Sequence, residues 1–343
     1  MKSSVKSIIS ILLAAVMLTA VCSCAKKADS SRIDGFAMDT TVSVTVYGDR
    51  ASDLAAAALR ETTALENALS WSIPTSEAAR INAAAGKPVS APQAAAILNA
   101  ALPLTDDTDG EFSLSLRRLC ALWGIGSDNA RVPTADEIAA TLADCDTSVT
   151  VSGDEVTLSN KSAELDFGAV GKGAACDKIA DLLSERKATA AVAAVGGSIL
   201  CYGKKPDGDW NIAVAVPGDV NTALGTLIFS GTAFVSTSGS EERFFIADGV
   251  KYHHIFSGIT GYPAKTGLTS VTVAASSGIL SDALATACFL LGYDRSLPLL
   301  EKYGANAVFV TDDMTVRVTA GLKNSFLLSN TEYTLIRQVN TLK

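Results

Sequence analysis

The sequence predicts an α+β protein built as a single domain. Strand-like alternation and helical periodicity are interspersed along its 343 residues without the regular β-α-β count of a parallel α/β fold. No Pro/Gly/Ser-rich linker, low-complexity segment or internal repeat divides the chain, and 48% hydrophobic residues provide for a sizeable core. We expect the domain to span residues 36–338, preceded by a short polar tether at residues 24–35.

The first 23 residues have the pattern of an export signal peptide. Lys2 and Lys6 precede an apolar run, residues 8–21, which is shorter than the roughly 20 residues that a membrane-spanning helix needs. The next letters, VCSC, resemble a bacterial lipobox in which Cys24 would carry lipid; ordinary signal-tail cysteines are the alternative. We therefore expect an exported lipoprotein, anchored on the extracytoplasmic face of a membrane, with 343 − 23 = 320 residues after cleavage.

The net charge of the chain limits which classes of ligand it is expected to bind. A formal net charge of −8 argues against nucleic acid, whose binding proteins carry basic patches. An anionic ligand would need local help from glycine turns, a lysine or a metal. Five cysteines follow the signal at irregular spacing without a C-x-x-C pattern, which favours buried small apolar residues over zinc ligands, with a disulfide left open. They are Cys120, Cys145, Cys176, Cys201 and Cys288.

In the first part of the chain, residues 38–48 alternate as a strand. Residues 52–70 have helical periodicity with Ser52 as a suitable cap. A loop and a short helix are expected within residues 71–86, and another helix at residues 91–102. An acidic loop then precedes the segment GEFSLSLRRLCALWGIG.

In the middle of the chain, residues 132–143 predict a helix started by proline, and residues 148–159 a hairpin with Gly153 in its turn. Residues 163–185 indicate a strand, a glycine turn and a helix. Residues 188–217 predict strands broken by a Gly-Gly pair and a polar loop.

Most of the remaining chain is strand-like. A helix is expected at residues 280–292, and a hairpin at residues 307–322.

The segment LDFGAVGKG is a candidate anion site. Gly168, Gly171 and Gly173 allow backbone amides to approach a ligand closely, and a helix from about Gly173 would point its positive end at the same place. Lys172 adds a positive charge. The spacing is that of neither a P-loop nor G-x-G-x-x-G, and a tight turn with a solvated lysine explains the segment equally well.

The segment DALAT is a candidate metal site. Asp282 and Thr286 are four residues apart at the start of a helix, so their oxygens share one face. A carboxylate and a hydroxyl suit a hard cation such as Mg²⁺. The alternative is a first-turn carboxylate favoured by the helix dipole beside a surface threonine.

Two further segments contain candidate site residues. The glycine pair Gly196-Gly197 again permits close backbone approach, although a β-turn explains it too. His253 and His254 are the only two histidines, and adjacent strand residues point to opposite faces, so at most one faces any given site. That histidine becomes a catalytic candidate if a nearby reaction needs proton transfer.

Eight segments in order carry a family resemblance. They are MDTTVSVTVYG, SEAARINAAAG, GEFSLSLRRLCALWGIG, LDFGAVGKGAACDKIADLL, VGGSILCYG, STSGSEERFF, YHHIFSGITGYPAKTGLTSVTV and SDALATACFLLG. Together they resemble the ApbE family of FAD:protein FMN transferases, over roughly residues 36–292 and the C-terminal hairpin.

The resemblance implies a Mg²⁺-dependent enzyme outside the cytoplasm that cleaves FAD, releases AMP and transfers FMN to a threonine or serine hydroxyl of an acceptor protein. It implies that Asp282, Thr286 and a backbone carbonyl near Gly171 hold the metal. His254 takes the place of the general base, while His253 points away. Lys172 would help to neutralise the pyrophosphate.

The resemblance also implies a set of FAD contacts. For Trp71, a place in the core is the alternative. The expected contacts are Met38, Trp71, Ser113, Asp166, Gly168, Lys172, Asp177, Gly196 and Gly197.

Two departures from the family pattern leave other functions open. Ser257-Gly258 stands where the family usually has Asp-Pro, and Ser113 stands where it has the aspartate of a Phe-Asp motif. One alternative is a Mg²⁺-dependent FAD pyrophosphatase that produces FMN and AMP. The other is a lipoprotein that binds FAD without turning it over.

Overall fold

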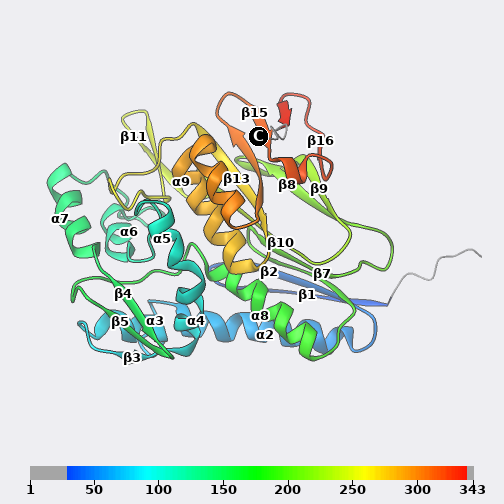
Figure 1. Ribbon diagram of the computed structural model, residues 1–343, viewed down its shortest axis with the longest axis horizontal. Coiled ribbons are helices and arrows are strands. Elements are labelled where there is room, and N and C mark those ends of the chain that lie inside the picture. The colour runs from blue at the N-terminus through cyan, green and yellow to red at the C-terminus, as the bar shows by residue number, and fades with distance from the viewer. Residues whose placement is uncertain (1–28, 338–343) are drawn as a thin grey trace, which may run out of the picture.

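The computed structural model describes residues 29–337, and a nine-stranded sheet forms its centre (Figure 1). The strand order is β1-β2-β6-β7-β10-β13-β14-β15-β17, antiparallel throughout except for the parallel pair β15/β17. These strands are β1 (Ser30–Ala37), β2 (Thr40–Tyr47), β6 (Ala190–Val195), β7 (Ser198–Gly203), β10 (Ala233–Gly239), β13 (Leu268–Ala275), β14 (Asn306–Thr311), β15 (Thr315–Val318) and β17 (Thr334–Arg337).

Three long helices pack against the sheet. Helix α2 (Ala51–Leu69) contacts β1 and β2, α8 (Gly171–Glu185) contacts β6 and β7, and α9 (Gly278–Lys302) contacts β10 and β13. The helices also contact one another in the order α2, α8, α9. Their apolar faces and the sheet enclose the largest core cluster, which holds the start of α9 in place.

A smaller antiparallel sheet packs on other strands of the central sheet, forming a second core cluster. It consists of β8 (Trp210–Val216), β9 (Asp219–Phe229) and β16 (Phe326–Leu328), and the 3₁₀ helix η1 (Ala320–Leu322) lies beside β14. Trp210, Leu227 and Phe326 from this sheet pack with Val308 of the central sheet. The chain is therefore layered, with helices and strands segregated as in an α+β protein.

The remaining elements lie beside the long helices, at the left in Figure 1. A third cluster around the buried Trp123 joins two of these helices to the loop after the last histidine. The elements are α3 (Glu77–Ala83), β3 (Val89–Ser90), α4 (Pro92–Ala101), α5 (Pro103–Asp107), α6 (Arg117–Trp123), α7 (Ala135–Cys145), β4 (Val149–Ser152), β5 (Glu155–Leu158), β11 (Phe244–Ala247) and β12 (Val250–His253).

The predicted α+β class and both predicted hairpins are confirmed, with Gly153 at φ 57° in the first turn. The proposed cap Ser52 is wrong, because α2 begins at Ala51 after Arg50 in the left-handed region, without a side-chain cap. The proline start of α7 is wrong too. Thr134 caps that helix in a reciprocal capping box with Glu137.

Other boundaries also differ. The strand expected before the glycine turn is only a single bridge between Glu164 and Leu116. Helix α8 begins at Gly171, two residues earlier than expected, and α9 continues past residue 292 through a kink at Gly292 (φ 77°). The part of the expected tether at residues 30–35 pairs with β2 as strand β1.

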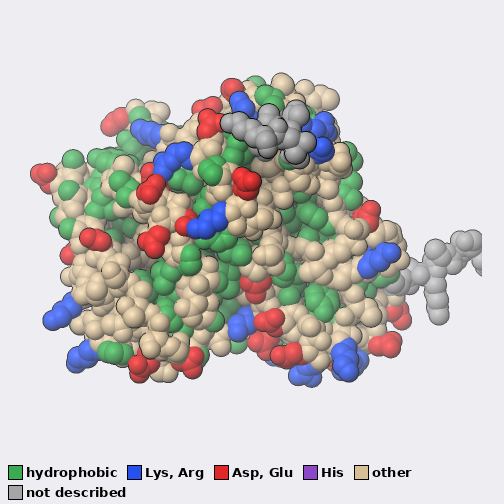
Figure 2. Space-filling model, in the orientation of Figure 1, with side chains coloured by type: hydrophobic (Ala, Val, Ile, Leu, Met, Phe, Trp, Pro, Cys, Tyr) green, Lys and Arg blue, Asp and Glu red, His purple; other side chains and the backbone are tan. Residues whose placement is uncertain are grey.

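The signal peptide and Cys24 lie outside the described residues. All five later cysteines are free, four of them buried, so the disulfide left open does not form. Within residues 29–337 no helix has the length and apolarity to cross a bilayer. On the face shown in Figure 2, acidic and basic side chains are scattered without a basic patch.

Candidate active site

The candidate site lies where the first turns of α8 and α9 meet. A Cβ on Gly173 would lie 2.0 Å from the carbonyl oxygen of Gly278, so only glycine permits this backbone contact. The contact brings the Gly173 N–H within 2.9 Å of Asp282 Oδ2, to which it donates. Two helices distant in sequence thus share one carboxylate.

Asp282 is only 2% exposed, and burial raises the pKa of its carboxyl. The Lys172 ammonium, the Gly173 N–H and the Ser198 hydroxyl act in the opposite direction, since each stabilises the charged carboxylate. Lys172 Nζ lies 4.0 Å from Asp282 Oδ1. The lysine is partly exposed, so it connects the buried carboxylate to the open side of the site.

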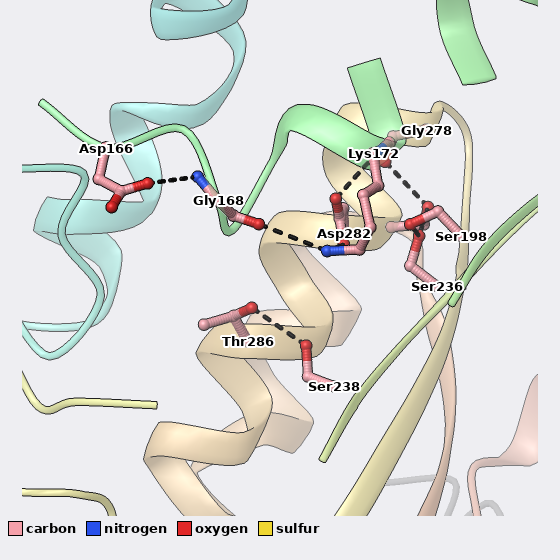
Figure 3. A network of polar contacts seen from close by, with 11 residues as sticks. Asp166, Gly168, Lys172, Ser198, Ser236, Ser238, Gly278, Asp282 and Thr286 are labelled. Carbon is pink, nitrogen blue, oxygen red and sulfur yellow. Dashed lines mark hydrogen bonds and ion pairs between the residues drawn. The ribbon is translucent and has the colours of Figure 1, made fainter. Parts of the chain in front are cut away.

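Thr286 lies one turn after Asp282 on the same side of α9, as the spacing predicted (Figure 3). Its Oγ1 is 3.1 Å from the Oγ of Ser238 on β10. Gly171 is the first residue of α8, and the Met38 sulfur lies 3.6 Å from the position of a Cβ there. Met38 therefore borders the expected metal site.

This donor set fits Mg²⁺. A carboxylate, a hydroxyl and a backbone carbonyl are hard oxygen ligands, and Mg²⁺ in proteins combines one or two carboxylates with water and substrate phosphates. Across residues 29–337, no three His, Cys, Asp or Glu side chains converge as a metal cluster. The remaining ligands of a Mg²⁺ ion at Asp282 would be water and phosphate oxygens.

Two turns lie around Lys172. One is the glycine turn at residues 168–173, and the other is the Gly196-Gly197 turn. Its Nζ donates to the carbonyl oxygen of Gly168 at 3.4 Å, and the Gly168 N–H donates to Asp166 Oδ1 at 2.8 Å. Gly196 has φ +55°, and a Cβ there would lie 3.3 Å from Lys172 Cδ and 2.8 Å from Thr40 Oγ1. The two turns form close walls around a positive charge, which suits a phosphate group.

The two histidines have different surroundings, as predicted. His253 is buried edge-on against Phe289; its Nδ1 accepts the Ile255 N–H, so its Nε2–H donates to the Ala264 carbonyl at 2.9 Å. His254 Nδ1 lies 3.2 Å from the carbonyl oxygen of Arg243. Because a carbonyl only accepts, Nδ1 carries the proton, and Nε2 keeps the lone pair that a base needs.

Burial is the main cause that lowers the pKa of His254 to about 4, and the positive charges of Arg243 and Lys172 contribute. The imidazole is therefore neutral at neutral pH. Contacts connect His254 to the start of α8 through Arg243, whose guanidinium donates to Asp39 at 2.8 Å, next to Met38 at Gly171.

Two of the predicted FAD contacts, Asp177 and Trp71, interact with other parts of the protein. Asp177 accepts the N–H groups of Gly278 and Ile279, at 2.6 and 2.9 Å, and so holds the start of α9. Trp71 is about half exposed, with the Arg117 guanidinium 3.5 Å above its ring.

The Ser113 side chain contacts Ser115 and the loop at Gly258. Its hydroxyl is 2.9 Å from that of Ser115, and its Cβ lies 3.4 Å from the position of a Cβ on Gly258. The two departures from the family pattern are therefore neighbours in space.

Some residues of the site were missed in the sequence. Glu242 Oε1 lies 3.8 Å from the position of a Cβ on Gly197, so its carboxylate borders the Gly-Gly turn. Ser238 contacts the predicted metal ligand Thr286, and Ser198 begins β7 directly after the Gly-Gly turn. The segments VGGSI and STSGSEER pointed to these residues, but only strand pairing could place them beside α9.

Comparison with known proteins identifies the family of this chain. The model of the ApbE family matches residues 38–309, and the chain belongs to that family. A FAD:protein FMN transferase from Treponema pallidum is 34% identical over 322 residues, covering 87% of this chain and 89% of the relative. One from Klebsiella pneumoniae is 32% identical, covering 66% and 72%.

Solved structures give the same result. The ApbE protein of Thermotoga maritima superposes with a TM-score of 0.79 at 28% identity, covering 87% of this chain and 99% of that one. The flavinyl transferase ApbE of Pseudomonas stutzeri has a TM-score of 0.73 at 28% identity, covering 88% and 94%. The resemblance read from the eight segments is confirmed, and with it the expectation of a transferase enzyme with this fold.

Proposed function

We propose that this protein transfers FMN from FAD to a threonine or serine hydroxyl of an acceptor protein outside the cytoplasm, in a reaction that needs Mg²⁺ and releases AMP. The observation that carries the proposal is the buried Asp282, which lies beside Lys172 and one helical turn from Thr286. The names of the relatives supply the flavin chemistry.

In this reaction the acceptor oxygen forms a bond to the FMN phosphorus, and the bond from that phosphorus to the bridging oxygen breaks. AMP leaves with the bridging oxygen. Bound Mg²⁺ would neutralise phosphate charge, held by Asp282, Thr286 and the Gly171 carbonyl. Phosphoryl transfer depends largely on positioning and electrostatic stabilisation, and Lys172 with the two glycine turns supplies both in a protein of net charge −8.

His254 accepts the proton of the acceptor hydroxyl at Nε2 in this proposal. Its tautomer is set by the Arg243 carbonyl, and its low pKa keeps the ring neutral and ready at neutral pH. The same low pKa makes it a weak base, so the proton can pass on to solvent or to the leaving phosphate.

Export and lipidation at Cys24 belong to the same proposal. The segment VCSC would anchor the enzyme to the outer face of the membrane, where it would meet its acceptor. Labelling with a radioactive fatty acid, lost in Cys24→Ala, would test the anchor. Labelling that persists in this variant would contradict it.

Mass spectrometry tests the transfer. The chain from Ala25 onward is incubated with FAD, Mg²⁺ and a domain carrying an acceptor threonine, and we expect the mass of the FMN phosphoester on the acceptor. Asp282→Asn and His254→Gln should lose the product, while Ser52→Ala, an exposed change on α2, should retain it. FMN and AMP without a modified acceptor would identify a pyrophosphatase instead.

The departures Ser113 and Ser257 do not argue against turnover. Ser257 Oγ accepts the N–H groups of Ile259 and Thr260 within its own loop. Within residues 29–337, neither serine hydrogen-bonds to the charged centre at Asp282. FAD that stays intact while bound would nonetheless support the non-catalytic alternative.

A further inference from the structure

Exposed apolar side chains are concentrated in the chain segment on either side of His254. Of the 12 large apolar side chains that are exposed within residues 29–337, five lie in this segment. They are Phe244, Ile246, Val250, Ile259 and Tyr262. Apolar side chains gathered on a surface mark a contact with another molecule more often than apolar side chains scattered singly. The surface beside the proposed base is therefore a candidate contact surface.

The hairpin of β11 and β12 carries three of these side chains and forms a two-stranded sheet of its own. It lies at the upper left of the molecule in Figure 1. One face is held by Tyr252, whose ring lies 5.4 Å from those of Phe245 and Trp123. None of the four residues of β11 is buried, whereas β12 ends in the buried His253. Within residues 29–337, β11 pairs with no strand other than β12, so its outer edge is free.

The free edge of β11 presents unpaired backbone groups. The His254 N–H donates to the Arg243 carbonyl at 3.2 Å, so these two residues are a hydrogen-bonded pair of the antiparallel ladder. Such pairs alternate along a ladder, and the backbone groups of Phe244 and Ile246 consequently point away from β12. Neither residue has a backbone partner in another element between residues 29 and 337. An unpaired edge of this kind is a template for an added strand.

This edge leads to the candidate active site. The strand begins directly after Arg243, whose guanidinium donates to Asp39 at 2.8 Å. The residue before that, Glu242, borders the Gly-Gly turn through its carboxylate. A strand added to β11 would lie about 4.8 Å from it. An extended segment that pairs with β11 and continues past its first residue would therefore pass between His254 and the Gly-Gly turn.

We propose that the free edge of β11 binds an extended segment of the acceptor protein, which adds to the hairpin as a third strand and so brings its threonine or serine to His254. The inference rests on the proposed function in one respect, namely that an acceptor hydroxyl reaches His254. In strand addition the main chain supplies the hydrogen bonds, and alternate side chains supply the specificity. The acceptor segment would thus be free of proline where it pairs, with apolar side chains that cover Phe244 and Ile246.

Kinetics of FMN transfer to the acceptor domain, followed by mass spectrometry over a range of acceptor concentrations, test the proposal. Ile246→Pro removes the outward N–H but no hydrogen bond to β12, and edge strands tolerate proline at such positions. We expect the KM for the acceptor to rise about 10-fold, because one hydrogen bond of the added strand is lost and its approach is hindered. The kcat at saturating acceptor should stay close to the wild-type value.

Ile246→Ser keeps the N–H and removes the apolar side chain, so the KM for the acceptor should rise by a smaller factor. It is also the second variant if Ile246→Pro does not fold. Leu327→Ser is the matched control, because Leu327 is an exposed apolar residue of another edge strand, β16, and its KM should be unchanged. All three variants should bind FAD like the wild type. They should also retain wild-type affinity for Mn²⁺, which replaces Mg²⁺ here because the EPR signal of the free ion reports its binding.

The outcomes that overturn the docking role are distinct. One is an unchanged KM for the acceptor in both Ile246 variants. Another is a fall in kcat with unchanged KM, which would mean that the hairpin only supports His254. A wild-type dimer in light scattering that becomes a monomer in Ile246→Pro would assign the edge to a second copy of this chain.

Failure of the proposed function has a different result. If the wild-type chain transfers no FMN to the acceptor domain, the transfer itself fails, and the docking role falls with it. If the wild type transfers FMN and the Ile246 variants match it, only the docking role is lost.

Discussion

Gly173 and Gly278 are in direct backbone contact where α8 and α9 cross. A Cβ on Gly173 would lie 2.0 Å from the Gly278 carbonyl oxygen, and one on Gly278 would lie 2.1 Å from that of Gly173. The atoms that would clash belong to the backbone, so neither helix can adjust by rotating a side chain. The contact therefore sets the distance between Lys172, in the first turn of α8, and Asp282, in the second turn of α9.

Gly173→Ala should separate the two helix ends. Overpacking of a close contact typically costs 1–3 kcal/mol and occasionally more, so we expect the free energy of unfolding to fall by about 3 kcal/mol. The Gly173 N–H should also move away from Asp282, which weakens Mn²⁺ binding. Urea unfolding and Mn²⁺ titration measure the two effects.

Gly231→Ala is the control for this substitution, because a Cβ there meets no atom within 4 Å and φ is not in the left-handed region. Its free energy of unfolding should stay within about 0.5 kcal/mol of the wild type. Equal losses in the two variants would show that the helix contact is not the cause.

Asp282→Asn should separate cation binding from folding. The amide oxygen can still accept the Gly173 N–H, while the negative charge, whose burial is unfavourable, disappears. We expect the free energy of unfolding to change by less than about 1 kcal/mol. Mn²⁺ affinity should fall by more than about 100-fold, since a ligand is worth more than an outer partner. A variant that unfolds would mean that Asp282 is mainly structural.

Part of the site could be predicted from the sequence because its signals are local. The four-residue spacing of Asp282 and Thr286 places both on one face of a helix, whatever the rest of the fold does. The adjacent histidines lie at the end of a strand and after it, so their separation into a buried ring and a partly exposed ring also follows from local geometry.

The missed parts depend on long-range contacts. Ser198 and Ser236 come together only through the pairing of β7 with β10, and Asp177 is occupied by amides of a helix about a hundred residues later. The errors in the predicted starts of α7 and α2 had causes in the neighbouring sequence. Thr134 with Glu137 forms a stronger helix start than the preceding proline, and a left-handed Arg50 starts α2 before Ser52 is reached.

Ser257→Asp, a return toward the family pattern, should be tolerated. The Ser257 hydroxyl accepts the N–H groups of Ile259 and Thr260 at 3.2 and 3.1 Å, and an aspartate can accept the same pair. We expect the free energy of unfolding to change by no more than about 1 kcal/mol. Thermal unfolding with and without FAD measures this.

Gly258→Pro, the second half of that pattern, should not be tolerated. The Gly258 N–H donates to the Glu111 carbonyl at 2.9 Å, and a Cβ would lie 2.3 Å from the Gly110 carbonyl oxygen. Proline removes the donor and adds the clash, so we expect a loss of about 3 kcal/mol or more. A Gly258→Pro variant as stable as Ser257→Asp would mean that this loop rearranges readily.

The low pKa of His254 should be visible in the pH dependence of stability. Burial lowers this pKa from 6.5 in the unfolded chain to about 4 in the folded one, so between these values the unfolded state binds a proton that the folded state does not. The contribution of His254 to stability is thus full above pH 6.5 and is lost as the pH falls toward 4. At about 1.4 kcal/mol per pKa unit, the loss reaches about 3 kcal/mol.

His254→Gln should remove that part of the slope, while the titration of His253 stays in both proteins. Urea unfolding at a series of pH values from 4 to 7.5 provides the comparison. In the wild type, the same pKa places the acid limb of kcat/KM near pH 4, well below that of an ordinary histidine base. Parallel stability curves for wild type and His254→Gln, with an acid limb near pH 6.5, would show that the His254 ring is solvated rather than buried beside Arg243 and Lys172.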